Sequence, residues 1–213
     1  MSEAVEQGDW GRAGGAEVRA LLAASGLVAG QQLAALSQLA PDLSVRLSLA
    51  TGAAERLVAP AGLTPTEASA LPIFETLVRE FEQRTRPTTW LEGLIRGCAV
   101  AGLSRDVTEL VRPHVTASAA DALDEASPAG EAFLVPLIHE SLGADPTQRD
   151  RASLYGRRLL AEMLALVQQV IARHLDLARF VTGASDDISV VSQWFPHLET
   201  GHARRMAEWG LIG

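Results

Sequence analysis

Apolar residues recur at three- and four-residue intervals along most of the chain, which is the spacing of one face of an α-helix. This pattern predicts helices over residues 16–39, 41–60, 65–84, 90–112, 118–142, 148–181 and 186–209. Alternation of apolar and polar residues at every second position is absent over any useful length, so we expect essentially no sheet. Because the connections are short, sequential helices should be antiparallel neighbours in an all-α bundle.

Helix-start signals support several of these boundaries. Thr64 is followed by Pro65 and by Glu67, which is the spacing of a capping box with proline in the first turn. Thr89 and Glu92 repeat that spacing, and Asp145 precedes the longest predicted helix. We expect Pro72 to kink or break the third helix, because proline removes one backbone hydrogen bond.

The composition fits a single helical domain. Apolar residues make up 47% of the 213 residues and aromatic residues only 5%, so the core must consist mainly of Ala, Leu and Val. We expect one domain over residues 16–213, preceded by a flexible tail over residues 1–15. No uninterrupted apolar run is long enough to span a bilayer, and no secretory signal is evident. A single cysteine, Cys98, excludes an internal disulfide and fits a cytoplasmic protein.

The charge argues against nucleic-acid binding. The formal net charge is −8, whereas a nucleic-acid-binding domain usually carries a basic stripe. The arginines that form local pairs are the only ones that merit a test: Arg84, Arg86, Arg157, Arg158, Arg204 and Arg205.

One Glu-x-x-His motif is the main chemical signal in the residues themselves. Glu199 and His202 stand three apart, which places both side chains on one face of a helix, as one iron of a di-iron site requires. A second copy of the motif is absent. Arg204 and Arg205 follow directly, so we expect an exposed, charged helix face here. Machinery for nucleophilic catalysis has no support, and we expect no catalytic or cofactor-binding residues.

Small residues spaced four apart occur in two predicted helices. Gly26 and Gly30 form one pair, and Gly93 and Gly97 form the other. In lipid this spacing favours helix dimers, whereas in an Ala-rich bundle it lets two helices approach closely. We favour the second interpretation.

Three stretches resemble an actinobacterial family of ferritin-like proteins that is similar to the MiaE-type tRNA hydroxylases. They are Glu82–Leu94, Gly156–Glu162 and His202–Met206, and they occur in the family's order. The resemblance implies a ferritin-like up-down bundle with additional helices. In the hydroxylases such a bundle holds two irons through four carboxylates and two histidines.

Aligned on this resemblance, most of the iron ligands are missing. The first carboxylate falls on Gln32, and the second helix keeps Glu55 but replaces its histidine with Val58. The third acidic position falls on Ala101. The last pair should lie near residues 127–130, where no ligand is visible. The resemblance therefore implies a vestigial site at Gln32, Glu55, Val58 and Ala101, with Glu55 buried near the other three and no bound metal or cofactor.

These observations favour a non-catalytic ferritin-like protein that acts as a structural or interaction module. One alternative is a di-iron tRNA hydroxylase that uses other ligands, such as Glu55, Glu162 and His202. Another is a small-molecule binder that uses the vacated core.

We also expect a homodimer or a protein partner. The last predicted helix is rich in large apolar side chains in a chain that has few aromatic residues, which places the expected contact near Trp194, Phe195, Met206 and Trp209. The alternative is that these side chains seal the end of the bundle itself.

Overall fold

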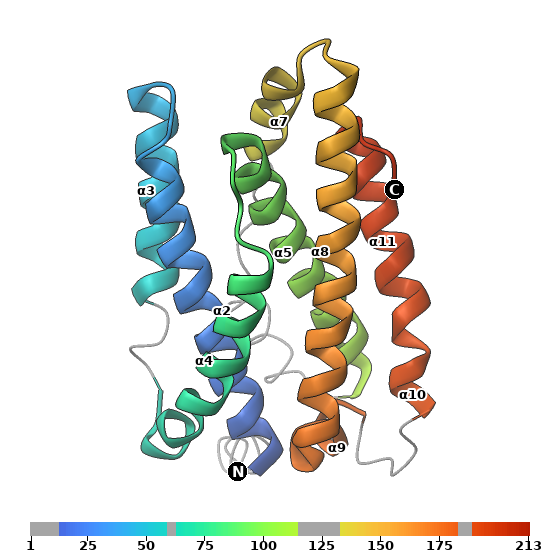
Figure 1. The fold of residues 1–213 in the computed structure, drawn as a ribbon. Coiled ribbons are helices and arrows are strands. Elements are labelled where there is room, and N and C mark those ends of the chain that lie inside the picture. Colours follow the sequence, from blue (N-terminus) through green and yellow to red (C-terminus); the bar gives the residue numbers. More distant parts are fainter. Residues whose placement is uncertain (1–12, 59–62, 115–132, 183–188) are drawn as a thin grey trace.

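The computed structural model describes residues 13–58, 63–114, 133–182 and 189–213, and these residues form an all-α bundle (Figure 1). No strand occurs within these ranges, so the predicted fold class is confirmed for this part of the chain. The elements are α2 (Ala13–Ser37), α3 (Leu43–Val58), α4 (Pro65–Arg84), α5 (Trp90–Val111), the 3-10 helix η2 (Arg112–His114), α7 (Leu134–Leu142), α8 (Pro146–Arg173), α9 (Leu175–Val181), α10 (Ser189–Ser192) and α11 (Trp194–Glu208).

Three of the predicted helix-start signals are confirmed. The Thr64 hydroxyl accepts a hydrogen bond from the Glu67 backbone N–H, and the Glu67 carboxylate accepts one from the Thr64 N–H, which completes the capping box of α4. The Thr89 hydroxyl caps α5 through the Glu92 N–H, but the Glu92 carboxylate accepts from Thr88, so the capping box predicted here is only half formed. The Asp145 carboxylate caps α8 in the same way, 2.9 Å from the Thr147 nitrogen.

Some predictions about helix continuity are wrong. The break predicted at Pro72 does not occur, since α4 runs through this exposed proline to Arg84. The single helix predicted over 186–209 is divided at Gln193 into α10 and α11 within the described residues. The single long helix predicted over 148–181 is two helices, since His174 leaves the helical conformation with φ −124° and ψ 80° and separates α8 from α9. Of the predicted fifth helix, the described residues contain only α7.

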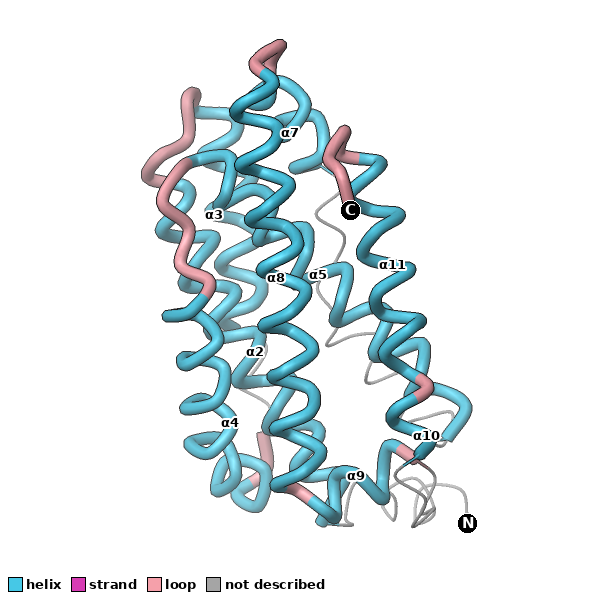
Figure 2. Tube along the Cα trace, turned by 45° about the vertical axis from the view of Figure 1, so that its right-hand side comes forward, coloured by secondary structure: helices cyan, strands magenta, loops and turns pink. Residues whose placement is uncertain are grey.

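The long helices α2, α4, α5, α8 and α11 run along a common direction (Figures 1 and 2). Helix α2 packs against α3, α4 and α9, and α5 packs against α7, α8 and α11. The core between them is built from aliphatic side chains that are fully shielded from solvent, among them Leu49, Leu94, Ile95, Leu134, Ile138, Leu159 and Met206.

Helix α3 contacts mainly α2 and lies at the edge of the bundle beside it (Figure 1). Its opposite face carries large apolar side chains that remain exposed, namely Leu43 at 66%, Leu47 at 59% and Val58 at 68%. An exposed apolar stripe of this kind is unusual on a protein that stays monomeric.

Glycines permit close approach between helices, as predicted. A Cβ added at Gly30 would lie 2.9 Å from Leu57 Cγ of α3, and one added at Gly93 would lie 2.6 Å from Leu36 Cδ1 of α2. Both distances are too short for a side chain. These glycines therefore set how closely α3 and α5 pack against α2.

The expectations about a membrane-spanning segment and about the dimer contact need correction. The stretch Gly15–Ser37 of α2 is long and apolar enough to cross a membrane, contrary to the prediction, although a core helix passes the same test. In this structure it packs against α3, α4 and α9, and 44% of its apolar window is buried. The predicted dimer contact on α11 is wrong for Trp194, Met206 and Trp209, which are at most 4% exposed because they seal the bundle's own core.

Candidate functional site

The four positions of the predicted vestigial site do not meet in the middle of the bundle. Gln32 on α2 is half-buried, and Ala101 on α5 is 3% exposed. Glu55 is exposed on α3, and Val58 is 68% exposed. The expectation that Glu55 is a buried carboxylate beside Gln32 and Ala101 is therefore wrong.

The packing of α3 explains this difference. Leu49 and Ala53 point toward α2 and are 0% and 3% exposed. Residues two and five positions after Ala53 lie on the other side of a helix with 3.6 residues per turn. Glu55 and Val58 therefore face away from α2.

The described residues do not fit a di-iron centre. The neutral Gln32 amide occupies the first ligand position, and its Nε2 donates a hydrogen bond to Glu82 Oε1 at 3.0 Å. Nowhere in the described part of the chain do three His, Cys, Asp or Glu side chains gather closely enough to hold a metal ion. The last predicted ligand pair, near residues 127–130, lies outside the described residues.

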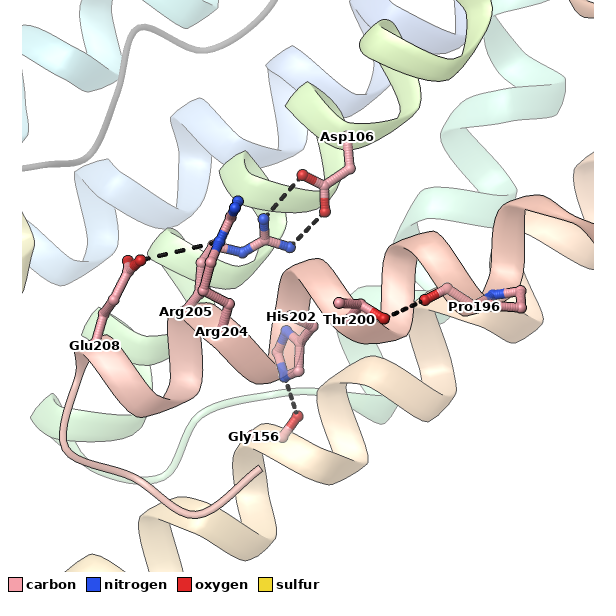
Figure 3. Close-up of polar contacts among 8 residues, drawn as sticks. All are labelled: Asp106, Gly156, Pro196, Thr200, His202, Arg204, Arg205 and Glu208. Atoms are coloured by element: carbon pink, nitrogen blue, oxygen red, sulfur yellow. Dashed lines mark hydrogen bonds and ion pairs between the residues drawn. The ribbon is translucent and has the colours of Figure 1, made fainter.

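The alternative iron ligands Glu55, Glu162 and His202 lie on three different helices and have separate surroundings. Glu162 on α8 forms an ion pair with Arg84 of α4 at 3.6 Å. His202 on α11 is 2% exposed, and its Nε2 lies 3.0 Å from the Gly156 carbonyl of α8, to which it donates a hydrogen bond (Figure 3). With Glu55 exposed on α3, these three residues form no common site.

Helix α11 also differs from the exposed, charged face that its sequence suggested. Arg205 is 8% exposed, and its guanidinium donates to both oxygens of Asp106 on α5, at 2.9 and 2.6 Å (Figure 3). Burial lowers the pKa of His202, with a further lowering by Arg205, while the Gly156 hydrogen bond and Asp106 oppose it. His202 and Arg205 thus tie α11 to α8 and α5, whereas Glu199 remains exposed.

A cavity of about 550 Å³ lies between α2, α4, the segment that joins α4 to α5, and α5. Its apolar lining includes Leu33, Leu36, Trp90 and Val100, and two of the predicted positions, Gln32 and Ala101, also line it. Exposed residues at its rim, such as Gln31, Gln83 and Thr88, show that it opens to the surface.

One buried arginine stands out among the residues that line this cavity. Arg96 of α5 is 2% exposed, and its Nε donates a hydrogen bond to the Thr85 hydroxyl at 3.0 Å. Its guanidinium also lies over the Phe81 ring, 5.5 Å from the ring centre, a cation–π distance. The Nη2 atom of Arg96 is buried and has no hydrogen-bond partner among the described residues.

Thr85 anchors this arginine at the end of α4. Its hydroxyl donates to the Phe81 carbonyl at 2.7 Å, and its own carbonyl accepts a hydrogen bond from the Tyr155 hydroxyl at 2.6 Å. Burial raises the pKa of Tyr155 well above its ordinary value, so this hydroxyl stays protonated and donates. The network joins α4, α5 and α8 and fixes the direction in which Arg96 points.

The sequence analysis singled out part of the cavity wall but did not predict the cavity or the role of Arg96. The stretch Glu82–Leu94, which carries the family resemblance, supplies much of the cavity wall. Arg96 follows it in an apolar run, Leu94-Ile95-Arg96-Gly97-Cys98. A lone arginine amid residues of a core helix was the available signal, because arginine is rarely buried without a partner.

Comparison with known protein families shows a match over most of the chain. The model of a family described as "Ferritin-like domain, actinomycetes" matches residues 11–184 of the chain. None of the curated proteins matches it. The matched stretch includes α2 to α9, and therefore every element that lines the cavity.

Proposed function

Since the chain belongs to the family of actinomycete ferritin-like domains, we propose that it is a non-catalytic member that binds a small organic molecule in the cavity between α2, α4 and α5. The main evidence for this proposal is the cavity itself. The alternative functions are di-iron hydroxylation and a purely structural role.

The size and lining of the cavity support ligand binding. Pockets that hold small molecules usually measure several hundred Å³, have mostly apolar walls, and place a few polar groups where they fix the ligand's orientation. A volume of about 550 Å³ falls within this range. Leu33, Leu36 and Val100 supply apolar wall, and Gln32 and Arg96 supply polar groups.

The state of the predicted iron ligands supports a role without di-iron chemistry. A di-iron site needs several carboxylates and imidazoles that converge on the metal. Gln32 instead offers a neutral amide that is already bonded to Glu82, and Ala101 offers no donor. Glu55 faces away from α2.

Titration calorimetry with octan-1-ol and octanoate tests the proposal. Both probes have a chain that fits the apolar part of the cavity, and they differ only in the head group. We expect at least one of them to bind the wild-type protein at one molecule per chain. Val100→Phe and Ala29→Phe, which place a phenyl ring in the cavity wall, should weaken that binding at least tenfold.

Leu154→Phe is the matched control, because it adds a similar ring at a position of α8 that is 59% exposed and outside the cavity. It should bind the probes as the wild type does. If octan-1-ol, octanoate and octyl phosphate, which has the same chain, all fail to bind the wild type, or if both cavity variants bind the probes unchanged, the proposed function is wrong.

A further inference from the structure

We infer that the ligand of this cavity carries an anionic head group, a carboxylate or a phosphate monoester, and that Arg96 binds that group at the inner end of the cavity. This inference rests on the proposed function and specifies the chemical class of the ligand.

The first support is the unused donor of Arg96. Its Nε is taken by Thr85 Oγ1, while the buried Nη2 has no partner. A buried donor without a partner is unfavourable, and fully buried polar groups in proteins are nearly always paired. A ligand oxygen at this end of the cavity would complete the hydrogen bonding of the guanidinium.

The second support is the unbalanced charge of Arg96. Within the described ranges no carboxylate lies within ion-pair distance of this guanidinium, although it is 2% exposed. The carboxylate that lines the same cavity, Glu82, accepts a hydrogen bond from Gln32 and acts on Arg96 only from beyond ion-pair distance. Burial lowers the pKa of Arg96 more than Tyr155 and Glu82 raise it, so the charge of the guanidinium is only partly compensated. A buried cation that is only partly compensated is costly, so an anion is favoured here over a neutral group.

The third support is the sign of charge around the cavity. Three arginines line it, Arg79, Arg86 and Arg96, against the one carboxylate of Glu82. Arg79 is paired with Glu75 at 2.6 Å, whereas the exposed Arg86 forms no ion pair with any described residue. A positive rim attracts anions and raises their rate of association.

The apolar wall of the cavity indicates the chemistry of the ligand beyond its head group. The apolar part of the lining comes from α2 and α5, with Leu33, Leu36, Trp90, Val100 and Ala101. These side chains offer no hydrogen bonds to a polar body. The ligand class is therefore a small amphiphile, with one anionic head and an apolar chain or ring.

The test compares three probes that share the same eight-carbon chain: octanoate, octyl phosphate and octan-1-ol. We expect one of the anions to bind the wild-type protein about ten- to a hundredfold more tightly than octan-1-ol, as charge-assisted hydrogen bonds in a buried site provide. The comparison of octanoate with octyl phosphate identifies the head group. This part of the test needs no variant.

Arg96→Met then removes the charge while keeping a side chain of similar length. It should remove the preference for the anion, so that neither octanoate nor octyl phosphate binds this variant more tightly than octan-1-ol does. Arg105→Met is the matched control, since Arg105 is an exposed arginine of the same helix outside the cavity, and it should keep the full preference. Arg96→Lys, which keeps the charge, should retain part of the preference for the anion over octan-1-ol. It replaces Arg96→Met in the test if that variant does not fold.

The outcomes separate this inference from the proposed function. Equal binding of anion and alcohol to the wild type, or an anion preference that survives in Arg96→Met, overturns the inference and leaves the cavity as a binding site. Failure of all three probes to bind overturns the proposed function as well.

Discussion

Loss of the Arg205 side chain should destabilise the protein far more than loss of its neighbour Arg204. Both arginines lie on α11 (Figure 3), but Arg205 is 8% exposed and forms two hydrogen bonds with the buried Asp106. In Arg205→Met the Asp106 carboxylate remains buried without its counter-charge. Removing one partner of such a pair costs about 3–5 kcal/mol of unfolding free energy.

This cost corresponds to a large shift in melting temperature. For a chain of this length, each kcal/mol shifts Tm by about 2–4 °C, so Arg205→Met should lower Tm by roughly 6–20 °C. Arg204 lies 4.0 Å from Glu208 with a side chain that is 72% exposed, and an exposed pair contributes little. Arg204→Met should therefore change the unfolding free energy by less than about 0.5 kcal/mol.

Urea unfolding followed by circular dichroism measures both variants against the wild type. The double variant Asp106→Leu with Arg205→Met supplies an internal check, because replacing both charges by apolar groups leaves no unpaired charge. It should be more stable than Arg205→Met alone. Similar stability of Arg205→Met and Arg204→Met would refute the reasoning, since it would mean that Asp106 needs no buried partner.

Three further predictions concern pH, self-association and RNA. Because burial lowers the pKa of His202, the unfolded chain binds more protons below the ordinary histidine pKa of about 6.5, so stability should fall as pH drops through that range. Urea unfolding between pH 5 and 7 should show a smaller fall in His202→Gln than in the wild type, and an equal fall in both would contradict this. We expect the chain to self-associate through the exposed apolar stripe of α3, so Leu47→Glu should give the monomer mass in light scattering at concentrations where the wild type exceeds it; equal masses would contradict this. With a net charge of −8, the protein should bind tRNA only weakly at physiological salt, and a sub-micromolar, salt-dependent affinity in filter binding would revive the hydroxylase.

Local sequence signals predicted the helices well because the determinants are themselves local. The Thr64 and Glu67 side chains satisfy the free N–H groups of α4 within four residues of chain, so their spacing alone identifies the boundary. The break at His174 was missed because no proline or glycine marks it. A continuous apolar period cannot show that one residue leaves the helical conformation.

The site was harder to predict because its contacts join residues far apart in the chain. Arg205 appeared exposed beside Arg204, since its partner Asp106 is 99 residues away. Glu55 appeared buried because the resemblance placed it on a core helix, whereas α3 turns that face outward. The cavity could not be predicted from sequence because it forms only when α2, α4 and α5 are packed together. The free hydrogen-bond donor of Arg96 could not be predicted either, because it depends on which residues surround the guanidinium.

Native mass spectrometry of the protein, purified after expression with added iron, distinguishes a ligand-binding cavity from a di-iron centre, because one spectrum shows bound metal and bound organic molecules together. We expect a chain that carries a small organic adduct, lost in Val100→Phe, and no pair of iron ions. A chain that carries two irons and no organic adduct would contradict this expectation.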